Sequence, residues 1–87
     1  MVKEAREQLE ITGSVYTLRP QRRNTGKNWY NYRRGDTKKG DVNIEFQMEI
    51  TDDNQLQWFL PFSGFNTVEE WRKKAKKSRY LYKVELI

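Results

Sequence analysis

The chain has 87 residues, which is enough for one small domain and too few for two independent cores. Charged residues make up 33% and the net charge is +5, yet 14% of the residues are aromatic, more than a disordered segment carries. The lack of cysteine and histidine excludes disulfides, thiol nucleophiles and zinc–cysteine sites, and removes the commonest general base. We therefore expect a single domain over residues 1–87 that binds a partner rather than transforms one, with no cofactor and no metal.

Neither a membrane span nor a secretory signal is indicated by the sequence. The longest purely apolar run is only three residues, at positions 58–60, so no segment is long enough to cross a bilayer. Residues 1–10 alternate acid and base and lack the apolar stretch of a signal peptide. We expect a cytoplasmic protein with no membrane partner.

The first third of the chain predicts a helix followed by two strands. Residues 1–10 have apolar positions at helical spacing and favour a short helix or a frayed arm. Residues 14–19 are β-branched and aromatic and predict a strand, which Pro20 ends. Residues 20–28 predict a polar, arginine-rich loop, and the alternation in residues 29–33 predicts the next strand.

The clearest strand is predicted over residues 42–50, where apolar and polar side chains alternate without a break. Such alternation is typical of a strand with one face in the core and one in water. Residues 30–34 are expected to form a long hairpin with it. The apolar set, expected on one face, is Val42, Ile44, Phe46, Met48 and Ile50.

The last third of the chain predicts a turn, a short apolar segment, a helix and a strand. Residues 51–54 form the turn, and residues 56–60 are either a strand or a single helical turn that Pro61 ends. Thr67 and Glu70 have the spacing of a helix capping box. The helix after them has one apolar stripe (Val68, Trp71 and Ala75), and residues 80–86 alternate as a terminal strand.

The order of these elements predicts an α+β fold. We expect a small curled antiparallel or mixed sheet, or a partial β-barrel, with one helix in the C-terminal half and a possible short N-terminal helix.

Charge is distributed in blocks along the chain. Residues 19–39 contain eight basic residues and one acid, residues 41–70 contain acids and no base, and residues 72–83 contain seven bases and no acid. Blocks of this kind either keep a protein soluble or give it a face that meets polyanions.

The strongest functional signal is the interleaving of arginines with aromatic residues between positions 19 and 34. Basic side chains bind phosphates, and exposed rings stack on unpaired bases. The alternative interpretation is that these rings belong to the core. The candidate nucleic-acid contacts in this segment are Arg19, Arg22, Arg23, Lys27, Trp29, Tyr30, Tyr32, Arg33 and Arg34, extended by Lys38 and Lys39.

A second basic cluster lies at the end of the capped helix, and it is expected either to extend this footprint or to form a solvated helical face. Its candidate contacts are Lys73, Lys76, Lys77 and Arg79. Paired acids (Glu45 and Glu49, Asp52 and Asp53, Glu69 and Glu70) lack the partners of a metal or acid–base site, and no catalytic residue is assigned.

Two segments near the C-terminus form a recognisable pattern: residues 64–71 (Gly-Phe-Asn-Thr-Val-Glu-Glu-Trp) and the closing strand at residues 81–86. With looser matches at residues 16–19 and 40–42, they resemble the ASCH domain family of the PUA-like group of small RNA-associated β-barrels. It implies a PUA-like barrel whose cleft, near residues 17–23 and 29–34, faces nucleic acid. Some members of the family act on RNA or modified nucleosides, but here no lysine stands at the matching spacing before Thr17.

These observations favour a small basic domain that binds RNA or single-stranded nucleic acid. One alternative is a PUA-like enzyme acting on RNA or on a modified nucleoside. A second is a protein-interaction regulator that uses the acidic residues Glu45, Glu49, Asp52 and Asp53. The oligomeric state is open.

Overall fold

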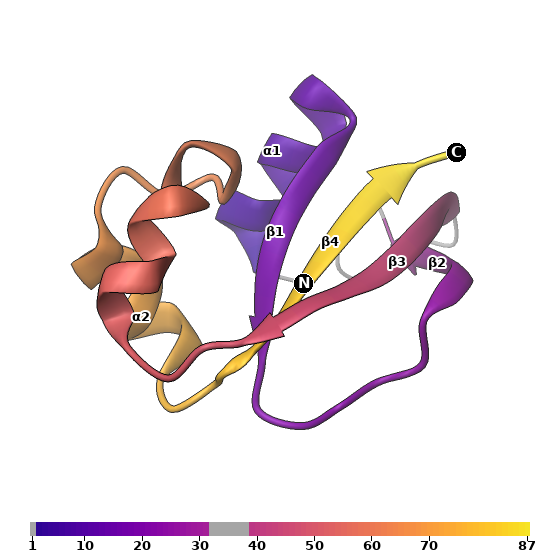
Figure 1. Cartoon of the computed structure of the whole chain (residues 1–87). Coiled ribbons are helices and arrows are strands. Elements are labelled where there is room, and N and C mark those ends of the chain that lie inside the picture. Colours follow the sequence, from indigo (N-terminus) through magenta and orange to yellow (C-terminus); the bar gives the residue numbers. More distant parts are fainter. Residues whose placement is uncertain (1, 32–38) are drawn as a thin grey trace.

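The computed structural model describes residues 2–31 and 39–87, of which residues 28–31 and 39–41 are described by their backbone alone (Figure 1). These residues form two α-helices, two 3₁₀ helices and four strands. In chain order they are α1 (Lys3–Thr12), β1 (Ser14–Arg19), β2 (Gly26–Asn31), β3 (Lys39–Glu49), η1 (Asp53–Trp58), η2 (Leu60–Phe62), α2 (Val68–Ala75) and β4 (Tyr80–Leu86).

The four strands form one antiparallel sheet in the order β1-β4-β3-β2. Within the described residues this sheet is open, with β1 and β2 at its edges, and the predicted α+β class is confirmed. Both α-helices lie toward the β1 side, whereas β2 lies at the far side (Figure 1). Of the helices described, none is long and apolar enough to cross a membrane.

The central strand β4 contributes buried side chains to both faces of the sheet, although Lys83 and Glu85 are charged and only partly buried. Tyr82 and Val84 contact Ala5 and Leu9 of α1 in one apolar cluster. We call this side of the sheet the α1 face; by register and alternation it also holds Val15, Thr17 and Arg19 of β1 and Val42, Ile44 and Phe46 of β3.

The opposite side, which we call the α2 face, packs against the segment from η1 to α2. Leu81 of β4 joins Leu56, Phe65 and Trp71 in a second cluster. Tyr16 and Leu18 of β1 pack against the same cluster. Each helical layer therefore has its own core, and β4 supplies side chains to both.

The predicted unbroken alternation over residues 42–50 is wrong at one point. The pairing of β3 with β4 shifts between Phe46, which lies opposite Tyr82, and Met48, which lies opposite Leu81. Such an irregularity reverses the faces of the residues beyond it. Met48 and Ile50 consequently join the core on the α2 face instead of the α1 face.

Three other boundaries differ from the prediction. The loop after Pro20 is shorter than expected, since β2 already begins at Gly26. Residues 53–58 and 60–62 form 3₁₀ helices, so the segment takes the helical one of its two predicted alternatives over a longer range than expected. Pro61 lies within the first two positions of η2 instead of ending a segment, because a proline there has no N–H bond to lose. The hairpin partner of β3 is described as far as Asn31.

Helix α2 begins at the predicted cap, where the Thr67 hydroxyl accepts a hydrogen bond from the Glu70 N–H at 3.1 Å; this is the Thr67 half of the predicted capping box. Its far end is fixed by Arg72, whose guanidinium donates to the carbonyls of Lys76 and Ser78 at 2.8 and 2.6 Å and pairs with Asp53 at 2.9 Å. These contacts orient α2 against the sheet.

Gly64 is the point where the segment before α2 meets α1. Its φ is +87°, and a Cβ there would lie 2.2 Å from the Glu4 carbonyl oxygen. Gly13, which ends α1 with a φ of +86°, has open space around it. The two glycines share a backbone conformation and differ in their surroundings.

We predict that Gly64→Ala lowers the free energy of unfolding more than Gly13→Ala. At both positions the alanine must adopt the left-handed backbone conformation, which costs roughly 1–2 kcal/mol. Only the alanine at position 64 also forces α1 to move. Chemical denaturation of the two variants measures the difference. Equal losses would contradict the close approach of Gly64 to α1.

Candidate nucleic-acid interface

Arg22 and two aromatic rings form the centre of the candidate site. The Arg22 guanidinium carbon lies 5.2 Å from the centroid of the Phe46 ring and 5.7 Å from that of the Tyr80 ring. Both separations are within the range of cation–π contacts. Phe46 is 39% exposed and Tyr80 is half-buried, so a charged group and aromatic surface are presented to solvent together.

Tyr82 connects this cluster to the core. Its ring is buried and packs edge-on against Phe46, with 5.5 Å between centroids. Its hydroxyl accepts a hydrogen bond from the backbone N–H of Arg23 at 2.8 Å. The loop after β1 is thereby held over the end of the α1 face that α1 does not cover.

Two further arginines surround the rings. Arg79 lies 5.6 Å from the Tyr80 centroid and pairs with Glu49 at 3.1 Å, so its charge is partly neutralised. Burial lowers the pKa of Arg19 below its ordinary value, and the nearby positive charge of Arg23 lowers it further. An anion bound here would relieve the repulsion between these two guanidinium groups. We call Arg19, Arg22, Arg23 and Arg79, with Phe46 and Tyr80, the arginine–aromatic cluster.

The structure thus brings together four of the residues singled out from the sequence. Lys27 is exposed at the start of β2. The backbone of Trp29, Tyr30 and Lys39 belongs to the β2–β3 pair. The remaining candidates in this part of the sequence, Tyr32, Arg33, Arg34 and Lys38, lie outside the described residues.

The second basic cluster is placed differently from the first. Lys73 is exposed on α2, and Lys76 and Lys77 are exposed where that helix ends. Arg79, the fourth residue of this second basic cluster, belongs to the arginine–aromatic cluster instead, whereas α2 itself packs on the other face of the sheet.

Sequence reasoning missed both rings of the cluster. It assigned Phe46 and Tyr80 to the core because they stand in alternating apolar runs. One available signal was length: a helix of about ten residues spans about 15 Å, whereas a nine-residue strand spans about 30 Å. One end of the α1 face had to remain uncovered.

The acidic residues expected to form a separate face are largely engaged within the chain. Glu49 pairs with Arg79 and Asp53 with Arg72, while Asp52 accepts the Asn54 N–H at 2.9 Å as the N-cap of η1. Groups of three or more potential metal ligands are not found among the described residues.

Comparison of the chain with protein-family models, curated proteins and solved structures found no significant match. The ASCH resemblance therefore remains a prediction from the motifs at residues 64–71 and 81–86.

We predict that Tyr82→Phe destabilises the protein by about 1 kcal/mol, the typical worth of one hydrogen bond, because the Arg23 N–H loses its acceptor. Tyr80→Phe is the matched control, since the Tyr80 hydroxyl has no hydrogen-bond partner among the described residues. Thermal or chemical denaturation compares the two. Equal stability of both variants would mean that the Tyr82 hydroxyl does not hold the loop.

Proposed function

We propose that this domain binds RNA, or single-stranded nucleic acid more generally, through the arginine–aromatic cluster. The observation that supports the proposal most directly is the Arg22 guanidinium lying over two partly accessible rings on an uncovered part of the sheet. Arginine binds phosphate oxygens in bidentate fashion, and a ring beside it offers stacking to a base.

The division of labour within the cluster follows from its contacts. Arg22 and Arg23 lie in the loop after β1 and have no carboxylate partner among the described ion pairs, so they are the expected phosphate contacts. Arg79 is already paired with Glu49 and is expected to orient Tyr80 rather than bind a phosphate. The ring expected to stack on a base is Phe46, the more exposed of the two.

A single strand fits this arrangement better than a duplex. In a duplex the faces of the bases are stacked on one another, so a ring on a sheet cannot reach them. The arginines alone would bind either form, because phosphate contacts are independent of base pairing.

We predict that Arg22→Gln weakens binding to single-stranded RNA and reduces its dependence on salt. Each phosphate contact to a single strand adds about 0.7 to the slope of log K against log salt, so the slope should fall by about that amount. Lys3→Gln removes the same charge from α1 and should leave the slope unchanged. Fluorescence anisotropy at several salt concentrations measures both; equal slopes for both variants would contradict the role of Arg22.

We predict that Phe46→Leu weakens single-strand binding by about fivefold or more, since stacking is worth ~1–3 kcal/mol per base. Binding to duplex RNA should change little. Trp58→Leu is the matched control, because Trp58 is 80% exposed but belongs to η1, which packs on the other face. Equal losses with single strand and duplex, or an equal effect of Trp58→Leu, would contradict stacking on Phe46.

A further inference from the structure

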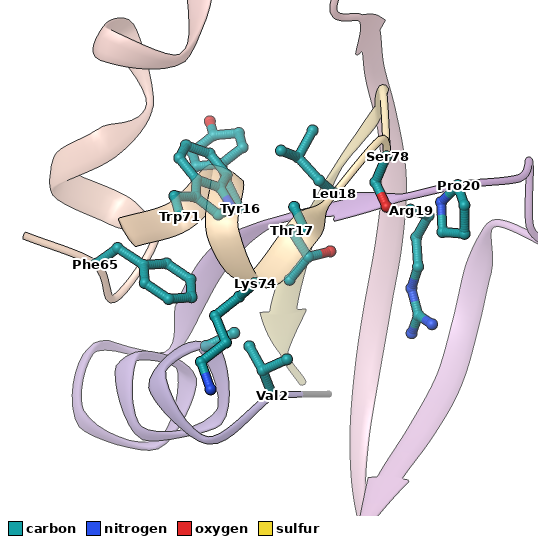
Figure 2. A pocket seen from close by; sticks show the side chains of 12 residues that line it. Val2, Tyr16, Thr17, Leu18, Arg19, Pro20, Phe65, Trp71, Lys74 and Ser78 are labelled. Atoms are coloured by element: carbon teal, nitrogen blue, oxygen red, sulfur yellow. The ribbon is translucent and has the colours of Figure 1, made fainter. Parts of the chain in front are cut away.

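A pocket of about 400 Å³ lies along the outer edge of β1, between α1 and α2. Five consecutive residues, from Tyr16 to Pro20, line one side of it. Figure 2 shows the rings of Tyr16, Phe65 and Trp71 toward one end and the Arg19 side chain at the other. The pocket therefore runs along an edge strand rather than ending in the core.

The backbone of β1 has free hydrogen-bonding groups on this edge. The Leu86 N–H donates to the Gly13 carbonyl at 2.8 Å, which fixes the odd-numbered residues as those that bond β4. The backbone N–H and C=O of Ser14 point away from β4, and there the Thr12 hydroxyl donates to the Ser14 carbonyl at 2.8 Å. The backbone N–H and C=O groups of Tyr16 and Leu18 point away from β4 in the same way, and they lack hydrogen-bond partners among the described residues.

The side chains around this edge define the chemistry that it can accept. Leu18 and Trp71 on the α2 face provide an apolar wall, while Arg19 and Lys74 are cationic. No carboxylate is found among the residues that line the pocket. Thr17 also lines it, and the Thr17 hydroxyl oxygen is buried without a hydrogen-bond partner in the described structure.

We propose that the edge of β1 binds an extended peptide of a protein partner by strand addition, and that this peptide alternates apolar and acidic residues. Strand addition uses backbone groups spaced two residues apart, as those of Tyr16 and Leu18 are. Side chains of an added strand point alternately to the two faces, so an apolar one would meet Leu18 and Trp71 and the next, acidic one would meet Arg19 or Lys74, the two cations of the pocket. This surface is separate from the rings of the arginine–aromatic cluster and is a second binding function.

The probe is a labelled pentapeptide, acetyl-Thr-Val-Glu-Val-Thr-amide, which matches the five residues along the pocket. In NMR spectra of the whole protein, the amide protons of Tyr16 and Leu18 should move downfield on titration, because they gain hydrogen bonds. Those of Val15 and Thr17, which already face β4, should move less and serve as internal controls.

N-methylation of the probe tests the backbone pairing directly. One version is methylated at its second and fourth residues and the other at its first, third and fifth. In an added strand only one of these sets faces β1, so one version should lose about tenfold in affinity and the other should bind nearly as before. Equal losses in both versions would overturn strand addition.

Charge is tested by Lys74→Glu with Lys73→Glu as the matched control, since Lys73 lies on the same helix but does not line the pocket. Lys74→Glu should weaken binding of the probe roughly fivefold or more, and Lys73→Glu should weaken it less than about twofold. Replacing the glutamate of the probe by lysine should weaken binding to the unaltered protein similarly.

Three results would overturn the proposal. One is the absence of a selective shift at Tyr16 and Leu18 at millimolar probe. Another is displacement of the probe by single-stranded RNA that shifts the same two amides, which would assign the edge to nucleic acid. The last is a dimer in sedimentation experiments whose Tyr16 and Leu18 amides are protected without probe, which would assign the edge to a second copy.

Discussion

The position of β4 between two apolar clusters is the constraint on which the rest of the structure depends. A strand placed in the middle of a sheet with a helical layer on each side must supply apolar groups alternately to two cores, as Tyr82 and Leu81 do. Neither layer is large enough to cover the sheet. The ten residues of α1 span about 15 Å, whereas the eleven residues of β3 span about 36 Å. The uncovered end of the α1 face therefore needs side chains that tolerate both water and apolar neighbours.

Arginines and aromatic rings satisfy that requirement, which is why the candidate interface stands where it does. Arg22 is exposed and its guanidinium lies over Phe46 and Tyr80, as amphipathic side chains do at a boundary of this kind. The buried ring of Tyr82 completes the core beneath them and uses its hydroxyl to hold the Arg23 backbone. The same side-chain contacts therefore stabilise this end of the sheet and hold its positive charges at the surface.

Local signals predicted most of the fold, because each is set by residues close in sequence. The cap at Thr67 and the strand at residues 80–86 depend on short-range spacing and are found as expected. The register shift after Phe46 could not be predicted from alternation, since the pattern in residues 42–50 is unbroken. It arises because β3 supplies Ile44 to one core and Met48 to the other, and this depends on where the two helical layers lie in space.

The same shift explains why the Phe46 ring was missed while the arginines of the candidate site were found. Arg22 stands in a polar loop that any interpretation places at the surface, whereas Arg19 ends the strand before that loop and is partly buried. Phe46 stands in an apolar run and would be buried if the alternation continued past it on the same face. Because the residues of β3 after Phe46 change faces, Phe46 is the last apolar residue of this strand on the α1 face. It therefore lies at the margin of the core on that face.

Arg19 links the two surfaces for which binding functions are proposed. It lines the pocket along β1, and it lies close enough to Arg23 for the two charges to lower its pKa beyond what burial does. An anionic group on either side would relieve that repulsion, but the guanidinium is a single charge and can be neutralised once. A peptide carboxylate at the edge of β1 would therefore weaken the binding of a phosphate by the arginine–aromatic cluster. A bound phosphate would weaken the binding of the peptide by the same free energy.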